Sequence, residues 1–329
     1  MRVILDNNIW SYIGTRDEAR AFEELEDDLG LRVVIPPSIL LEILRTPDTK
    51  ALTAIVRSIT SRRGTRLHPL PEARLEADEF AREAERLRPH WVRPFPKPKR
   101  SDLEAFWTRR IWQSAARDPQ SVVKALPEAM ERTAEQVLSV QRDNKEVFVA
   151  SGSNLLAGGP PLADLSGHRN ADLTAGWNGN LIDSWRLDGA RRWWQAISTA
   201  LGRAKELGGE RSLIDWLEVT LEIAMVGRDR AGYNRFWYEG VSEEMMPRNW
   251  MRSVVDWVQL ESKIGSGNPR DGQHAAYLFD VGLFMTADKN FGRALERLRP
   301  WCPRPFAEVR RVPAEGSIVD ALRGVLGPA

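Results

Sequence analysis

The chain has 329 residues, of which 42% are hydrophobic, and a formal net charge of +1. This length suits either two domains or one domain with a large insertion, and the small charge excludes a global attraction to polyanions. Any contact with nucleic acid must therefore come from a local patch. A single cysteine, Cys302, excludes a disulfide framework, and four scattered histidines argue against a structural zinc site.

Strand and helix patterns alternate over the first ninety residues. Short apolar runs predict strands at 2–5, 31–35 and 65–68, and helical spacing predicts helices at 16–29, 38–45 and 48–60, followed by a charged surface helix at 72–88. The end of the chain resumes this alternation, with predicted helices through 279 and at 290–298 and predicted strands at 281–286 and 306–311. Such alternation predicts a parallel sheet flanked by helices.

The middle of the chain has a different composition. Eleven of the thirteen tryptophans lie between Trp91 and Trp257, the apolar residues follow helical spacing, and residues 151–180 have the composition of a long loop. We therefore expect an α/β fold with a discontinuous domain at 1–88 and 266–312, interrupted by an all-helical insertion at 89–265. Residues 313–329 would form a C-terminal tail or helix.

The sequence also predicts where the protein resides. The N-terminal apolar run, residues 3–5, is too short for a signal peptide. The most apolar stretch, residues 213–226, contains three acidic residues and is typical of a buried helix rather than a membrane span. We expect a cytoplasmic protein with no membrane partner.

Four acidic residues occupy positions that favour a shared site. Asp6 and Asp288 follow predicted strands, and open parallel sheets bind ligands at the carboxyl ends of their strands. Glu42 lies in a wholly apolar helical turn, where an unpaired carboxylate is costly. Asp271 opens a helix that continues with Ala275 and Ala276. Clustered carboxylates suit a hard cation such as Mg²⁺, which activates water and orients a phosphodiester.

Each acid also has a purely structural interpretation. Asp6 can end a strand and begin a turn, and Asp288 can cap the helix that follows it. Asp271 can stabilise the first turn of its helix, and Glu42 can reach water at the end of its helix. Their joint occurrence in these contexts favours the metal site.

Four sequence stretches that carry these acids resemble PIN-domain nucleases. They are residues 3–10, with Asp6 and Asn8, residues 35–44, with Glu42, residues 271–276, and residues 283–291, with Thr286 and Asp288. The resemblance implies that Asp6, Glu42, Asp271 and Asp288 bind Mg²⁺ or Mn²⁺ and cleave RNA, with Asn8, Thr286 and Asn290 in support. It covers under half of the chain.

The chain also departs from the family pattern. Asn7 replaces the usual threonine or serine, Asn290 stands where many members have another aspartate, and typical members lack the insertion. Many bacterial members are toxins or act in defence or RNA processing, which adds an inhibitor or partner protein to the expected partners. Small members often dimerise, so the resemblance implies a homodimer unless the insertion occupies that interface.

The insertion begins with a basic and aromatic stretch. Residues 86–117 contain nine lysines or arginines and two acids, interleaved with aromatic residues. This pattern suits single-stranded nucleic acid, although charge runs are often solvated faces and tryptophans often belong to the core. The candidate contacts to RNA are Arg93, Lys97, Lys99, Arg100, Arg109 and Arg110.

Other functions are compatible with the same sequence. A haloacid-dehalogenase-type phosphatase needs a second aspartate at the position of Asn8, and a dinucleotide-binding domain needs a glycine-rich turn after its first strand, so both are rejected. A non-catalytic interaction module and a structure-selective DNA nuclease stay open as alternatives to the ribonuclease.

Overall fold

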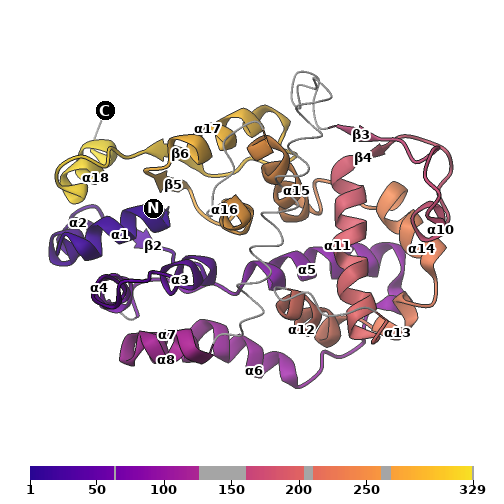
Figure 1. Ribbon diagram of the computed structural model, residues 1–329, viewed down its shortest axis with the longest axis horizontal. Helices are drawn as coiled ribbons and strands as arrows, with labels where there is room; N and C mark the ends of the chain where they lie inside the picture. The colour runs from indigo at the N-terminus through magenta and orange to yellow at the C-terminus, as the bar shows by residue number, and fades with distance from the viewer. Residues whose placement is uncertain (63, 126–160, 204–209, 261–267, 328–329) are drawn as a thin grey trace.

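The computed structural model describes residues 1–62, 64–125, 161–203, 210–260 and 268–327 (Figure 1). Four parallel strands form one sheet in the order β2-β1-β5-β6. Their bounds are β1 (Arg2–Leu5), β2 (Arg32–Val33), β5 (Leu283–Thr286) and β6 (Glu308–Arg311). The predicted parallel sheet flanked by helices is therefore confirmed, and its two central strands come from opposite ends of the sequence.

Burial explains which strands are central. Residues 3–5 of β1 and the whole of β5 are buried, as expected for apolar runs covered on both faces. The pairing runs from Val3 opposite Leu283 to Leu5 opposite Met285, so the two strands end at the same edge of the sheet. Where a third strand was predicted at 65–68, a single parallel bridge joins Leu67 to Val34.

Helices from both ends of the chain surround this sheet. They are α1 (Asn7–Thr15), α2 (Ala19–Asp28), α3 (Pro37–Ile43), α4 (Thr49–Thr60), α16 (Asn268–Ala275), α17 (Lys289–Leu298), the short η4 (Arg299–Trp301) and α18 (Ile318–Leu326). Helix α1, which the sequence analysis did not predict, packs against α3, α4 and β5. Helix α18 packs against α1 and α2, so the C-terminal segment contains a helix rather than a tail alone.

The middle of the chain forms a second, mainly helical half, at the right of Figure 1. Its helical segments are α5 (Glu72–Leu87), η1 (Pro89–Trp91), α6 (Lys99–Ala105), η2 (Phe106–Arg110), α7 (Ile111–Arg117), α8 (Pro119–Ala125), α10 (Ala171–Thr174), α11 (Ser184–Ala200), α12 (Glu210–Thr220), α13 (Ile223–Val226), α14 (Arg230–Arg235), η3 (Phe236–Gly240) and α15 (Pro247–Leu260). Helices α6 to α8 extend back towards the sheet, where α7 and α8 contact α4.

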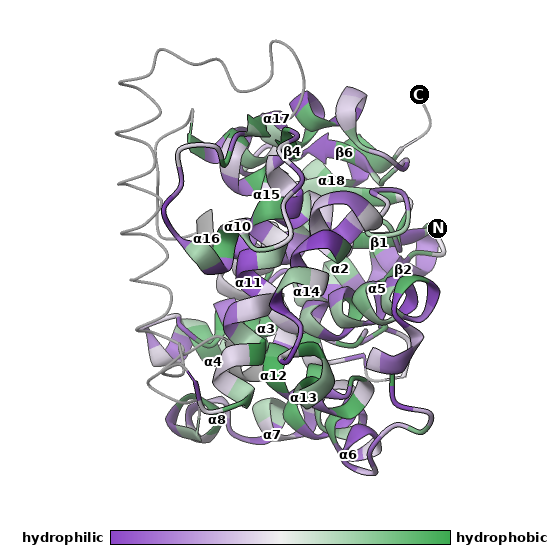
Figure 2. Ribbon diagram, turned by 90° about the vertical axis from the view of Figure 1, so that its right-hand side faces the viewer, coloured by the Kyte–Doolittle hydropathy of each residue, from purple (hydrophilic) through white to green (hydrophobic). Residues whose placement is uncertain are grey.

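Tryptophans supply much of the core of this half. Six of them are fully buried, namely Trp91, Trp185, Trp193, Trp216, Trp237 and Trp250. Figure 2 shows hydrophobic and hydrophilic residues mixed along the helices, as expected for amphipathic helices that share a core. The described helices include none that is both long and apolar enough to span a membrane.

The expectation of an all-helical insertion is wrong in one place. Strands β3 (Leu162–Ala163) and β4 (Ile182–Asp183) pair as a short antiparallel ribbon. Two-residue strands are too short to produce a visible alternation of apolar and polar residues, which explains why the sequence did not reveal them. Of the loop predicted at 151–180, residues 151–160 lie outside the described residues, and the remainder includes β3 and α10.

The prediction that residues 72–88 form a charged surface helix is also wrong, because α5 is largely buried. Glu76, Glu79 and Glu83 are at most 1% exposed, and each bonds to the helical half. The carboxylate of Glu79 accepts hydrogen bonds from the backbone N–H groups of Arg248 and Asn249, in the first turn of α15. Buried acids on α5 therefore hold α15 in place, in agreement with the preference of helix N-termini for negative charge.

A pair of aspartates between α11 and α15 predicts a pH-dependent stability. Burial raises the pKa of Asp188 to about 7, with Arg191 opposing the rise and Asp256 adding to it. Because an unfolded aspartate titrates near 4, the folded state loses stability as the pH rises from about 4 through 7. We expect Asp188→Asn to be more stable than the wild type above pH 7 by about 1–3 kcal/mol, and equal to it at pH 4.

Urea unfolding at a series of pH values measures this difference. The control is Asp164→Asn, because hydrogen bonds from Ser166 lower the pKa of Asp164 and give the opposite sign. A constant difference between Asp188→Asn and the wild type from pH 4 to pH 8 would contradict the prediction.

Candidate functional site

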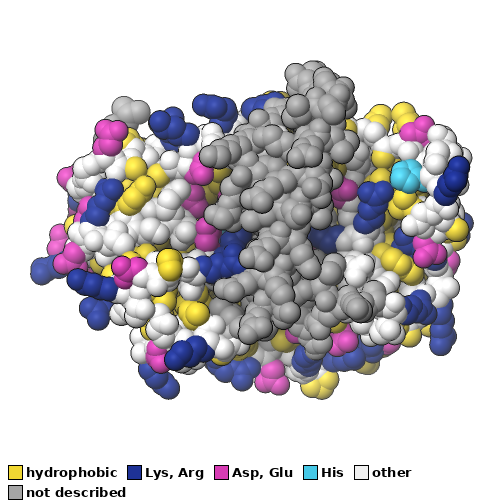
Figure 3. Space-filling model, in the orientation of Figure 1, with side chains coloured by type: hydrophobic (Ala, Val, Ile, Leu, Met, Phe, Trp, Pro, Cys, Tyr) yellow, Lys and Arg dark blue, Asp and Glu magenta, His cyan; other side chains and the backbone are white. Residues whose placement is uncertain are grey.

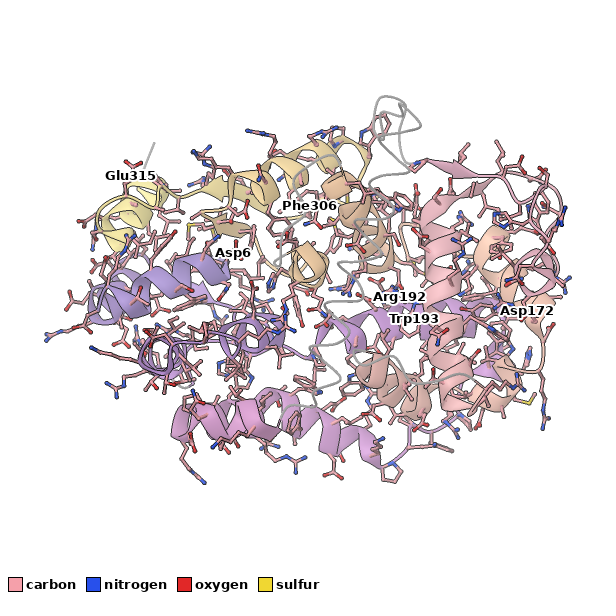
Figure 4. The ribbon with its side chains drawn as sticks, in the orientation of Figure 1. Asp6, Asp172, Arg192, Trp193, Phe306 and Glu315 are labelled. Atoms are coloured by element: carbon pink, nitrogen blue, oxygen red, sulfur yellow. The ribbon has the colours of Figure 1, made fainter. Side chains whose placement is uncertain are left out.

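Asp6 lies at the carboxyl end of β1, beside β5 and α16 (Figure 4). Its backbone N–H extends the ladder to Met285, and its Oδ1 accepts the N–H of Asn7 at 2.7 Å as the cap of α1. Its Oδ2 accepts hydrogen bonds from Thr286 Oγ1 at 2.5 Å and from Asn8 Nδ2 at 3.1 Å. These contacts hold a buried carboxylate, 6% exposed, in a fixed orientation at the edge of the sheet.

The pKa of Asp6 is affected by the nearby charges of His274 and Glu42. Burial raises its pKa, and the hydrogen bond from Thr286 and the charge of His274 oppose the rise. Repulsion from Glu42 raises the pKa further. Glu42 is therefore close enough to Asp6 to act on it, although the two lie 36 positions apart in the chain.

Glu42 is placed by α3, whose start is set by Pro36 and Pro37, a favoured arrangement for a helix N-terminus. His274 Nε2 lies 2.8 Å from Glu42 Oε2. Burial alone would raise the pKa of Glu42, but the hydrogen bond and charge of His274, assisted by Arg270, hold it below its ordinary value. Glu42 is therefore ionised at neutral pH.

Asp271, in the first turn of α16, is the acid on which the charges of the other three act. Burial raises its pKa well above the ordinary value, and repulsion from Asp6, Glu42 and Asp288 adds to this effect. Its Oδ2 accepts a hydrogen bond from Gln259 Nε2 at 2.5 Å, which lowers the pKa only in part. An acid under this combined repulsion gains from any cation that binds among the four.

Asp288 is exposed and caps α17, because its Oδ1 accepts the backbone N–H groups of Asn290 and Phe291. The capping role foreseen as its structural alternative is thus present, together with its electrostatic effect on Asp271. Thr286 Oγ1 accepts the N–H of Asp288 at 2.9 Å while donating to Asp6. The described contact of Asn290 to Asp288 is made by its backbone.

Asn8 links the two central strands beyond their ends. Its Nδ2 donates to Asp6, and its Oδ1 accepts the backbone N–H of Ala287 at 3.2 Å. Figure 4 shows Asp6 on the side of the sheet half that is nearer the middle of the molecule. Figure 3 shows acidic and basic side chains next to each other on the described surface of that side.

The donor set can be tested against a hard divalent cation. Among the described residues, no three His, Cys, Asp or Glu side chains stand close enough to ligate one ion as they are placed. Glu42 and Asp271 instead bond to His274 and Gln259. The chemistry nevertheless suits such a cation, since Asp6, Glu42 and Asp288 each repel Asp271, and Asn7 Oδ1 is buried without a hydrogen-bond partner. The Asn7 side chain also hydrogen-bonds to Glu42, which places this orphaned oxygen beside the acids.

Two arginines border the acids. Burial lowers the pKa of Arg270 to about 10, with repulsion from Arg45 adding to this effect and the attraction of Glu42 opposing it. The Nη1 of Arg270 is buried without a hydrogen-bond partner. Arg270 acts on Glu42 and Arg45 acts on Arg270, so these two cations are suited to an anionic substrate that lies near Glu42.

The basic stretch of the middle region is only partly available for RNA. Arg93 pairs with Glu222 at 2.9 Å, Lys99 pairs with Asp215 at 2.7 Å and Arg100 pairs with Glu104 at 2.9 Å, all within the helical half. Of the six candidate contacts, Lys97, Arg109 and Arg110 remain exposed, and the nearby ring of Phe95 is 83% exposed. Arg110 also donates to the backbone oxygen of Asp102.

Sequence reasoning missed four residues at this site: His274, Gln259, Asn7 and Arg270. His274 stands three positions after Asp271, on the same face of α16, and this spacing was the available signal. Gln259 comes from α15, in the presumed insertion, so nothing local to the four motifs indicates it. The helical half thus contributes directly to the acidic site.

Comparison of the chain with protein-family models, with curated proteins and with solved structures finds no match.

Proposed function

We propose that this chain is a PIN-like endoribonuclease that depends on Mg²⁺ or Mn²⁺. The observation that carries the proposal is that burial and the repulsion from Asp6, Glu42 and Asp288 together raise the pKa of Asp271 well above its ordinary value. These four acids would hold the metal, and a toxin, defence or RNA-processing role follows from the family that the motifs resemble. Such a cluster is poorly stable without a cation, which a structural role alone does not explain.

The residues around the cluster have separate tasks in this proposal. When bound, the metal supplies positive charge that polarises the phosphodiester and lowers the pKa of water. Asn8 and Thr286 keep the carboxylate of Asp6 in one orientation, and Asn7 Oδ1 offers a further oxygen ligand. Arg270 and Arg45 attract the phosphate groups of the substrate and place the chain beside the acids.

The basic stretch would bind RNA away from the acids. Lys97, Arg109 and Arg110 would neutralise phosphates, and the exposed ring of Phe95 would stack on a base. The ion pairs of Arg93, Lys99 and Arg100 reduce their share in this contact, because each is already neutralised by an acid of the helical half.

Incubation with labelled single-stranded RNA and DNA of the same sequence tests the proposal. We expect the RNA to be cut internally with Mn²⁺ or Mg²⁺, EDTA to stop the reaction, and the DNA to stay intact. Absence of cleavage with both metals would reject the enzyme in favour of an interaction module. Cleavage of the DNA alone would replace the ribonuclease by a DNA nuclease.

A further inference from the structure

His274 bridges two side chains that stand one helical turn apart on α3. Its Nδ1 lies 3.0 Å from Ser38 Oγ, and its Nε2 lies 2.8 Å from Glu42 Oε2. The imidazole is 2% exposed and Ser38 is 1% exposed, so this contact is shielded from solvent. Helix α16 packs against α3 here, which brings His274 to its two partners across 236 and 232 positions of sequence.

We propose that His274 is a positioning residue that fixes the Glu42 carboxylate in the orientation required for metal binding. This inference rests on the proposed function, because it assumes that the acids hold a divalent cation. His274 would not bind the metal itself, since both ring nitrogens already have protein partners.

Hydrogen-bond chemistry fixes the role of the ring nitrogen that faces Glu42. An ionised carboxylate can only accept, so Nε2 must carry a proton and donate it. The hydroxyl of Ser38 can either donate to Nδ1 or accept from it, so Ser38 satisfies the second ring nitrogen in either case. Ser38 therefore holds the ring in the orientation in which Nε2 faces Glu42, and rotation of the ring would break both contacts.

The same arrangement is the usual means by which a protein orients its metal ligands. A residue that hydrogen-bonds to a metal-binding side chain, without touching the metal, fixes the orientation of that side chain. Removing such a residue typically weakens metal affinity by about 10–100-fold. In this chain the group is His274, on α16, and Ser38 supports it from the turn of α3 that precedes Glu42. The Asn7 side chain also hydrogen-bonds to Glu42, so the carboxylate of this α3 residue is held by residues of α1 and α16.

Two substitutions of His274 separate positioning from packing. The amide of glutamine can place its N–H where Nε2 stands, whereas the amide of asparagine reaches only the position of Nδ1. We expect His274→Asn to weaken Mn²⁺ binding by about 10–100-fold and His274→Gln to restore it to within a few-fold of the wild type. Ser38→Ala, which removes the hydrogen-bond partner of Nδ1, should give an intermediate loss.

Isothermal titration of the full chain with MnCl₂ measures these affinities, and circular dichroism confirms that each variant is folded. His168→Asn, at an exposed histidine in the helical half, is the matched control and should bind Mn²⁺ like the wild type. Wild-type affinity in His274→Asn, or equal losses in the glutamine and asparagine variants, would overturn the inference. If the His274 variants do not fold, unchanged affinity in Ser38→Ala overturns it.

The same measurements distinguish a failure of the proposed ribonuclease function from a failure of the positioning role of His274. In the first case the wild-type chain itself would neither bind Mn²⁺ nor cleave RNA, and both proposals would fall together. A wild-type chain that binds Mn²⁺ and cleaves RNA, beside a His274→Asn variant of unchanged affinity, would overturn the positioning role alone.

Discussion

Replacing Asp6 with asparagine should reduce RNA cleavage by roughly a thousandfold or more, because it removes the most firmly held carboxylate of the cluster. The substitution keeps the volume of the side chain, and asparagine caps helices as well as aspartate does. The new amide N–H₂ group cannot accept the hydrogen bonds that Thr286 and Asn8 donate to Asp6, which destabilises the folded state. The removal of a buried charge offsets part of this cost. We expect a net destabilisation of about 1 kcal/mol.

Asp48→Asn is the matched control for this experiment. Asp48 caps α4 through the N–H groups of Lys50 and Ala51, as Asp6 caps α1, but it is exposed and none of the described contacts joins it to the acids. Initial rates with Mn²⁺ and melting temperatures of both variants provide the measurement. Asp6→Asn with wild-type activity would remove Asp6 from the chemistry and with it the metal site.

Local patterns were sufficient to predict the two central strands of the sheet half. Apolar runs such as residues 3–5 and 283–286 are specific for strands covered on both faces, and the acids directly after them had to share one edge because parallel strands end together. The sequence therefore predicted the positions of Asp6 and Asp288 at that edge. Helix α1 was not predicted, although Ile9 and Ile13 have helical spacing, because an aspartate after a strand can equally begin a turn.

The helical half was predicted less well, because its polar residues form contacts over long sequence separations. The glutamates of α5 are typical of a solvated face, and only the arrival of Arg248 and Arg192 from distant helices makes their burial favourable. The same reason hides Gln259 and His274. Each acquires its role by bonding to an acid on another element, and one sequence alone carries no record of such pairs.

Asp271→Asn should stabilise the metal-free protein, although it removes a proposed metal ligand. The pKa of Asp271 is raised in the folded state, so the wild type loses stability as the pH rises above about 4, where the unfolded aspartate ionises. Asparagine removes the repulsion from the other three acids and can still accept the hydrogen bond from Gln259. We expect a gain of about 1–2 kcal/mol at pH 7 in EDTA, and none at pH 4.

Metal should reverse this order of stability. A ligand that binds only the folded state at a hundred times its dissociation constant adds about 2.7 kcal/mol, so Mn²⁺ should stabilise the wild type strongly and Asp271→Asn hardly at all. Thermal unfolding of both proteins, each in EDTA and in Mn²⁺, gives the four melting temperatures to compare.

The control Asp320→Asn neutralises a first-turn acid on α18, far from the cluster along the chain, and should be slightly destabilising in both conditions. The prediction is contradicted if Asp271→Asn is less stable than the wild type in EDTA at pH 7. The repulsion among the acids would then be weaker than the contacts that Asp271 makes, and Asp271 would have a structural role instead of a metal-binding one.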